Sequence, residues 1–181
     1  MTGAHRRSGI LDQAAELNRL GSVLDAAFEN RQRDPESWSR AADAFKAALA
    51  AFYEPLEQAA AALRDSDTEL ETALRFLEVD PWCFRSGYMK QKLLRRVARW
   101  ARTSGDRVRL QGVVLLRVRN PQPGLLEPTG RIAARVWSEE LHAAVLDVMR
   151  TGAPHQQDAA RRLLDRVAEL RGTTTGDRVT E

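Results

Sequence analysis

Residue types suited to catalysis or metal binding are few in this sequence, and their spacing does not assemble a site. The three histidines, His5, His142 and His155, are far apart. Glu139 and His142 form one Glu-x-x-His, the spacing at which a helix offers two ligands to a di-iron centre. Such a centre needs a second copy and further glutamates, and the sequence has no second copy. Because acids are favoured at helix N-termini, we interpret Glu139 as a helix-start residue and expect no metal or cofactor.

Nucleophilic and phosphate-binding motifs are also missing. The sequence has no Gly-x-x-x-x-Gly-Lys-Ser loop, no Gly-x-Gly-x-x-Gly and no Gly-x-Ser-x-Gly. Its one cysteine, Cys83, lies between Trp82 and Phe84, with Arg85 close by. An open, cationic setting would make this thiol reactive. Free cysteines are among the most buried residues, so we expect a small apolar role instead. Because no acid, base and nucleophile can be combined, we expect no enzyme.

A basic stretch is the most informative chemical feature of the chain. Residues 81–119 contain 11 lysines and arginines and 1 acid, whereas residues 9–80 contain 15 acids and 7 bases. The stretch includes a predicted stripe of six cations on one surface: Lys92, Arg95, Arg99, Arg102, Arg107 and Arg109. This cationic stripe could neutralise the phosphates of a nucleic acid or meet an acidic protein. It could equally be solvated, or paired with the chain's own acidic helices.

Aromatic residues are concentrated in a short turn before this stripe. Trp82, Phe84 and Tyr88 are three of the eleven aromatic residues, and Arg85 lies among them. Tryptophan, tyrosine and arginine are enriched at the energetic hot spots of protein interfaces, and such rings also stack on unpaired bases. The same rings could instead fill the junction between the acidic hairpin and the basic half, since aromatic residues dominate cores as well. The sequence leaves both interpretations open.

Length and composition fit an ordinary globular domain. The 181 residues, 43% apolar and 29% charged, suffice for a core without disulfides or metals. A single cysteine cannot form an internal disulfide, so nothing indicates an oxidising compartment. No stretch approaches the ~20 apolar residues of a membrane span, and no signal-like apolar run follows the basic N-terminus. We therefore expect a cytoplasmic protein that does not enter a membrane.

Helical periodicity accounts for the first 64 residues. Apolar residues recur at intervals of three and four over 10–30 and again over 34–64, which places each set on one face of a helix. Asp34 can cap the second helix, and Pro35 suits its first turn. Pro55 should kink this helix, because it removes a backbone hydrogen bond. Together the two helices predict an antiparallel hairpin.

Shorter helices are predicted for the rest of the chain. The spacing indicates helices over about 66–79, 86–102, 131–137, 138–151 and 154–171, with a proline-rich break at 120–130. Residues 107–119 are ambiguous, because their many valines suit a buried strand. A lone strand would leave its backbone groups unsatisfied, so a helix is favoured. Residues 1–9 and 172–181 are polar and are expected to be disordered.

The last two predicted helices resemble one HEAT-type repeat. A helix ends in the turn Gly152-Ala153-Pro154, and the return helix carries Ala159-Ala160-Arg161-Arg162 before Leu163-Leu164. Residues 106–119, behind 89–102, could form a second and distorted unit. Three clean repeats are not visible, so a compact helical bundle stays an alternative to a short solenoid. HEAT-like proteins are mostly scaffolds that bind proteins or nucleic acid along one face, which is what the resemblance implies here.

The sequence thus predicts an all-α protein. An N-terminal antiparallel hairpin (10–64) packs on a compact, HEAT-like multi-helix array (65–171) to form one globular unit. The predicted function is that of a non-catalytic protein-interaction or adaptor module that binds an acidic partner. Its candidate surface combines the cationic stripe with Trp82, Arg85 and Tyr88. The alternative function is nucleic-acid binding through the same stripe.

Overall fold

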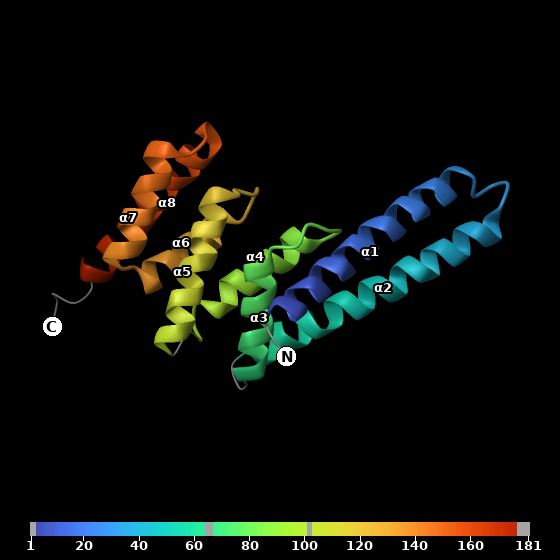
Figure 1. The fold of residues 1–181 in the computed structure, drawn as a ribbon, viewed down its shortest axis with the longest axis horizontal. Helices are drawn as coiled ribbons and strands as arrows, with labels where there is room; N and C mark the ends of the chain where they lie inside the picture. Colours follow the sequence, from blue (N-terminus) through green and yellow to red (C-terminus); the bar gives the residue numbers. More distant parts are fainter. Residues whose placement is uncertain (1–2, 64–66, 101–102, 177–181) are drawn as a thin grey trace. The chain divides into compact units, whose positions relative to one another are not determined.

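The protein is built from α-helices in all the residues that the structure describes. The computed structural model describes residues 3–63, 67–100 and 103–176, and these ranges contain no strand (Figure 1). The predicted all-α class is therefore confirmed. In chain order the helices are α1 (Gly3–Glu29), α2 (Pro35–Ala62), α3 (Asp67–Val79), α4 (Ser86–Val97), α5 (Ser104–Arg119), α6 (Leu126–Val136), α7 (Glu139–Thr151) and α8 (Pro154–Gly176).

The chain divides into two compact units, residues 1–89 and 90–181. The first unit holds α1, α2, α3 and the first residues of α4, and the second holds the rest of α4 and α5 to α8. The division therefore falls inside α4, whereas the sequence predicts a hairpin that ends near residue 64 and a separate set of helices after it. In the structure α3 belongs with the hairpin, because it packs against both α1 and α2.

The first unit begins with the predicted hairpin of α1 and α2, which pack along each other (Figure 1). Asp34 caps α2 as expected, since its carboxylate accepts the backbone N–H of Ser37 at 2.9 Å and so satisfies a first-turn donor. α2 continues through Pro55 to Ala62. α1 differs from the prediction in its length, because its helical backbone begins at Gly3 and not near residue 10.

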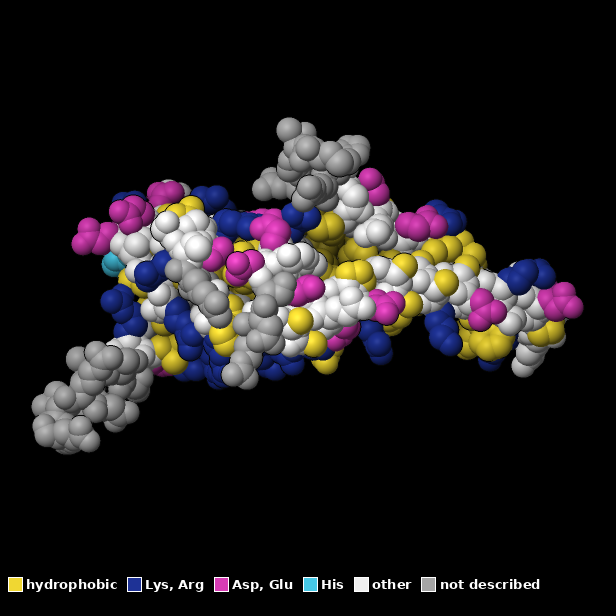
Figure 2. Space-filling view, turned by 90° about the horizontal axis from the view of Figure 1, so that it is seen from below, with side chains coloured by type: hydrophobic (Ala, Val, Ile, Leu, Met, Phe, Trp, Pro, Cys, Tyr) yellow, Lys and Arg dark blue, Asp and Glu magenta, His cyan; other side chains and the backbone are white. Residues whose placement is uncertain are grey.

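The core of the first unit lies between α3 and the second half of α2. Phe52 and Phe76 are buried, and their rings meet edge to face with centroids 6.1 Å apart. Leu74 and Leu77 of α3 are fully buried beside them; burying a side chain of this size stabilises the fold by about 1.5–3 kcal/mol. Burial falls toward the tip of the hairpin, where Phe28 is 49% exposed. Figure 2 shows apolar side chains at the surface of this end, on the right.

The second unit is organised around α5, which packs against α6, α7 and α8. α5 is helical over Ser104–Arg119, so a helix is the correct interpretation of residues 107–119. Its residues Leu110, Val114 and Val118 are fully buried. Apolar residues lie nearly all round this helix because it has neighbours on several sides. Thr103 and Asp106 form a capping box, in which each side chain accepts the other residue's backbone N–H at 3.0 Å.

Three helix boundaries in the second unit differ from the sequence prediction. α4 ends at Val97 and not near residue 102, and a turn with a hydrogen bond from the Trp100 N–H to the Val97 carbonyl follows it. α6 begins at Leu126, five residues before the predicted start. Pro128 therefore lies in its first turn, where a missing N–H costs no helical hydrogen bond. α8 continues to Gly176, beyond the expected end at residue 171.

Candidate interaction surfaces

The segment that joins α3 to α4 has an unusual backbone. Asp80 and Arg85 both adopt positive φ angles, 53° and 62°, although neither is glycine. For residues with a side chain this left-handed conformation costs roughly 1–2 kcal/mol each. Pro81 stands directly after Asp80 and fixes the direction in which the chain leaves α3. A strained turn of this kind persists only where surrounding contacts hold it in place.

Two side chains of the hairpin supply such contacts. Asn18 of α1 donates its amide N–H to the carbonyl oxygen of Trp82 at 2.8 Å. Tyr53 of α2 donates its hydroxyl to the carbonyl oxygen of Phe84. A hydrogen bond of this type stabilises a fold by about 0.5–1.5 kcal/mol, so the pair offsets a substantial part of the strain. The backbone of the turn is thus held at two carbonyl groups, those of Trp82 and Phe84, by residues distant in sequence.

Cys83 points inward from the same turn. Its side chain is 8% exposed, as the sequence analysis expected, and its backbone N–H donates to the Ser86 hydroxyl oxygen at 3.1 Å. The sulfur lies 3.6 Å from the Tyr53 hydroxyl oxygen. Burial, followed by the contact with Cys83, raises the pKa of Tyr53 well above its ordinary value. The Tyr53 hydroxyl therefore stays protonated and contacts the turn as a neutral group.

Three aromatic side chains point the other way, toward solvent. Trp82 is 71% exposed, Phe84 50% and Tyr88 64%. The Phe84 ring lies edge-on to Phe45 of α2, 5.5 Å between centroids, and the Arg85 guanidinium lies 5.5 Å from the Phe84 ring. In the first unit the turn therefore buries the cysteine side chain and exposes its three aromatic rings to solvent. We call Trp82, Phe84, Arg85 and Tyr88 the aromatic turn.

A groove that the sequence analysis did not identify runs beside the aromatic turn. It has a volume of about 450 Å³ and lies between the outer face of α2 and the residues that open α4. Apolar atoms of Leu49, Ala50 and Tyr53 contribute to its walls, which carry both acidic and basic groups. The full lining is Lys46, Leu49, Ala50, Tyr53, Glu54, Glu57, Arg85, Tyr88 and Met89. Helical periodicity could not reveal it, because the turn supplies its second wall.

The cationic stripe is only partly described by the structure. Arg95 and Arg99 are exposed, Lys92 is half-buried, and Arg102 lies outside the described residues. Residues 92, 95 and 99 follow one another at spacings of three and four, which would place them on one face of a continuous helix. α4 ends at Val97, so Arg99 belongs to the turn that follows it. We call Lys92, Arg95 and Arg99 the cationic face.

The last two predicted members of the stripe have different surroundings. Arg107 is exposed, and its guanidinium donates to the carbonyl oxygen of Arg135 at 3.3 Å, near the C-terminal end of α6. A cation is favourable there, because the carbonyl end of a helix carries partial negative charge. Arg109 is half-buried on α5. Arg107 thus has a structural role within the second unit.

Two buried cations were not singled out by the sequence analysis. Lys90 is fully buried and Arg117 is 2% exposed. Their spacing carried a signal, because Lys90 precedes Leu93 by three residues and Arg117 follows Val113 by four. Both therefore lie on the inward faces of their helices. Their burial is not predicted from residue type, because lysine and arginine are expected to face water.

The residues considered for metal binding do not converge. His142 lies beside Trp137, with ring centroids 5.5 Å apart. Across residues 3–63, 67–100 and 103–176, no group of three histidine, cysteine or acidic side chains could hold a metal ion. The carboxylate of Glu140 has a pKa held below its ordinary range, first by its own backbone N–H and then by the Ser138 hydroxyl. The lowered pKa is explained by the position of Glu140 in the first turn of α7, where backbone N–H groups favour a negative charge.

Among the helices of the described part, none combines the length and the apolar character required to cross a bilayer. Comparison with protein-family models, with curated proteins and with solved structures gives no match to this chain.

Proposed function

We propose that the protein is a non-catalytic interaction module that binds an acidic protein partner. The observation that carries this proposal is the aromatic turn, which exposes Trp82, Phe84 and Tyr88 to solvent while its backbone is fastened to the hairpin. Exposed rings are costly in water, and three of them within the seven residues 82–88 form a concentrated apolar surface. Such a surface gains free energy when a partner covers it.

The fastening of the turn favours recognition over a purely local role. Binding costs less when the contact residues are already held in their bound conformation. The hydrogen bonds from Asn18 and Tyr53 provide this, because they fix the carbonyls of Trp82 and Phe84. Tryptophan, tyrosine and arginine are also the residue types that contribute most to interface affinity. The aromatic turn has all three.

The preference for an acidic partner rests on the cationic face. Arg95 and Arg99 are exposed, and residues 81–119 carry eleven basic residues against one acid. Exposed cations contribute mainly to the rate and selectivity of association, through attraction that salt screens. The apolar contacts of the aromatic turn would supply affinity, and the cationic face would select the charge of the partner.

A scaffold role of the HEAT type belongs to the same proposal. α7 and α8 contact each other and are joined by a short connection at Gly152 and Ala153, as the two helices of one repeat are. α5 packs on both of them. A cytoplasmic location is likewise proposed, from the single cysteine of the chain.

Nucleic-acid binding is the second candidate function. The exposed guanidinium groups of Arg95 and Arg99 favour it, because arginine pairs well with phosphate. The exposed ring of Tyr88 suits stacking on an unpaired base. Binding of this kind would lose affinity steeply with salt, since each phosphate contact releases counterions.

Peptide selection with the full chain tests the proposal. A random peptide library displayed on phage is selected on the immobilised protein, and the peptides obtained are titrated by fluorescence anisotropy. We expect acidic peptides with apolar anchors, whose affinity falls when Arg95 and Arg99 are both replaced by glutamate. The matched control replaces Arg150 and Arg161 by glutamate, because these two are exposed elsewhere on the second unit and give the same change of net charge.

The outcomes separate the two functions. Selected peptides without acidic residues, or an equal loss in the control, would remove the acidic-partner proposal. Labelled single-stranded and duplex oligonucleotides are titrated in parallel at about 50 and 200 mM salt. Binding to these probes that depends on Arg95 and Arg99, with no peptide selected, would replace it by nucleic-acid binding.

A further inference from the structure

The groove beside the aromatic turn is a binding site that the proposed function does not yet use. It lies within the first unit, and its volume of about 450 Å³ falls in the range of ligand pockets, about 300–1,000 Å³. One wall is the outer face of α2, and the other is formed by Arg85, Tyr88 and Met89. Arg85 and Tyr88 also belong to the aromatic turn, so the groove and the aromatic turn form one continuous surface.

The α2 wall is a single helical face. Ala50 is exposed and Leu49 is half-buried, whereas Phe52 and Leu56 of the same helix are buried in the core. The residues of the wall recur at spacings of three and four, which keeps them on one side of the helix. α2 therefore presents a second, partly apolar face to solvent. Its members are Lys46, Leu49, Ala50, Tyr53, Glu54 and Glu57.

The charges of this face are separated along the helix. Lys46 and Glu54 lie at opposite ends of the apolar part, eight residues or about 12 Å apart. Both side chains are exposed, and the Glu54 carboxylate accepts a long hydrogen bond from the Gln58 side chain at 3.5 Å. Arg85 of the second wall and Glu57 add one charge of each sign. A ligand that follows α2 along the groove therefore meets a cation, an apolar stretch and an anion in that order.

The two walls are held together by contacts within the first unit. The hydroxyl of Tyr53 in the α2 wall donates to the carbonyl oxygen of Phe84 in the turn. The Phe84 ring meets Phe45 of α2 edge-on, with centroids 5.5 Å apart. Met89 of the second wall is fully buried. The groove is therefore formed before a ligand arrives, which lowers the free-energy cost of binding.

The walls favour a helical ligand over an extended one. α2 supplies one wall, and the first turn of α4 supplies most of the other. Neither wall has the row of unpaired backbone groups that an extended peptide pairs with at the edge of a sheet. An extended chain would place its own unpaired N–H and C=O groups on apolar side chains, which costs free energy. A helix pairs its own backbone and can insert apolar side chains spaced three and four residues apart.

We infer that the groove binds one amphipathic helix of the acidic partner, an inference that rests on the proposed function. Apolar side chains one turn apart on that helix would lie against Leu49, Ala50 and Tyr53. Charge complementarity places an acidic residue of the partner helix against Lys46 and a basic residue against Glu54. Because these two charges lie about 12 Å apart along α2, the acid and the base should be about seven or eight residues apart in the partner helix.

Selection from a helical peptide library on the immobilised full chain tests this inference. The library is an alanine-rich framework of about 16 residues, long enough to form a helix, with randomised positions on one face only. We expect selected peptides to carry apolar residues in the centre of that face, an acid at one end and a base at the other. The same library with a proline in its centre, which breaks the helix, should give no binders.

Two variants of α2 locate the binding. Ala50→Arg fills the groove from an exposed helical position and should weaken the selected peptides at least about tenfold. Ala51→Arg is the matched control, because Ala51 is the next residue, is also exposed and lies outside the lining. It adds the same charge and should bind like the wild type.

Double-mutant cycles test the pairing of charges. Lys46→Gln should weaken a selected peptide by about two- to fivefold at low salt, the usual range for an exposed ion pair. It should have no further effect once the acid of the peptide is replaced by glutamine. Glu54→Gln should behave in the same way toward the base of the peptide.

Three results would overturn the inference: no helical peptide selected, equal binding to Ala50→Arg and Ala51→Arg, or peptide charges that show no coupling to Lys46 and Glu54. A dimer of the protein that Ala50→Arg dissociates, measured by analytical ultracentrifugation, would assign the groove to a second copy instead. The acidic peptides from the random library are also titrated with Ala50→Arg. If they bind this variant normally, the proposed function stands and this inference alone fails.

Discussion

Replacing Tyr53 by phenylalanine should loosen the aromatic turn and leave the core of the first unit in place. The substitution removes one hydroxyl group, which donates to the Phe84 carbonyl and lies 3.6 Å from the Cys83 sulfur. The ring itself, packed edge to face on Phe52 with centroids 4.9 Å apart, is kept. The change is therefore confined to the fastening of the turn.

The size of the effect follows from the contacts. A single hydrogen bond between neutral groups stabilises by about 0.5–1.5 kcal/mol, and Tyr53 is half-buried, so we expect a loss of about 1 kcal/mol. The two left-handed residues, Asp80 and Arg85, then lose one of the constraints that oppose their strain. Because 1 kcal/mol corresponds to roughly a fivefold change in an equilibrium constant, local opening of the turn should become about five times more frequent.

Hydrogen–deuterium exchange read by mass spectrometry measures this opening. The peptide that covers residues 80–88 should exchange about fivefold faster in Tyr53→Phe, while a peptide within α3 should change little. The matched control is Tyr88→Phe, since that ring is 64% exposed on the same turn. Exchange that stays at the wild-type rate, or that rises equally in the control, would refute the reasoning.

The same hydroxyl gives the prediction a pH dependence. Its pKa is raised by burial and by Cys83, so the folded protein holds the proton more tightly than the unfolded chain does. The resulting stabilisation is complete below the unfolded value, about 10, and is lost as the pH rises toward the folded value. Urea unfolding at about pH 9 and pH 11 should therefore show a larger loss for the wild type than for Tyr53→Phe.

Three other substitutions test the packing and the electrostatics of the second unit. Gly130→Ala places a Cβ 2.7 Å from the Cγ of Arg166, so overpacking should outweigh the gain in helix propensity and lower the free energy of unfolding, measured by urea titration, by about 1 kcal/mol. Gly112→Ala places its Cβ with no atom within 4 Å, so it should raise the free energy of unfolding by up to about 1 kcal/mol in the same titration. Ser138→Ala should raise the pKa of Glu140 toward its ordinary value, because one of the donors that lower it is lost. A lowered pKa contributes stability that disappears as the pH falls through the folded value, so an unchanged NMR titration of Glu140 in Ser138→Ala would contradict this assignment.

The helices that could be predicted from sequence are those with strong local signals. Asp34 and Pro35 mark the start of α2, and the capping and dipole rules placed Ser138 before α7, where its hydroxyl oxygen accepts the Leu141 N–H at 3.2 Å. α5 was assigned by elimination, since a single strand would have had no partner. The start of α6 differs from the prediction, because Pro128 occupies the first turn of the helix and not the proline-rich break.

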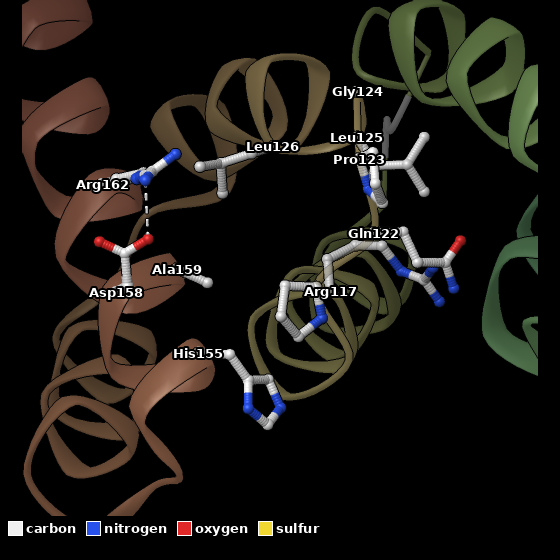
Figure 3. Close-up of a pocket in the computed structure, with 11 residues that line it drawn as sticks. Arg117, Gln122, Pro123, Gly124, Leu125, Leu126, His155, Asp158, Ala159 and Arg162 are labelled. Atoms are coloured by element: carbon white, nitrogen blue, oxygen red, sulfur yellow. Dashed lines mark ion pairs between the residues drawn. The ribbon is translucent and has the colours of Figure 1, made fainter.

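The candidate surfaces were less predictable, because they depend on contacts between distant parts of the chain. The backbone of the aromatic turn is held in part by Asn18, which lies 64 residues before Trp82 in the chain and donates to its carbonyl oxygen. No periodicity encodes that contact. A cavity in the second unit likewise combines Arg117 with a proline loop and the start of α8 (Figure 3). A buried lysine or arginine can be recognised in a sequence only by its position on the apolar face of a helix, since its charge alone predicts exposure.

The dissociation constant of a selected acidic peptide, measured for Trp82→Ala and Tyr88→Ala, tests the central claim most directly. If the aromatic turn is the interaction surface, at least one of these variants should weaken binding by about 2 kcal/mol, or roughly 30-fold. Trp38→Ala removes a tryptophan that is 38% exposed on α2, and should bind like the wild type. Unchanged binding in both turn variants, or an equal loss in Trp38→Ala, would contradict the account.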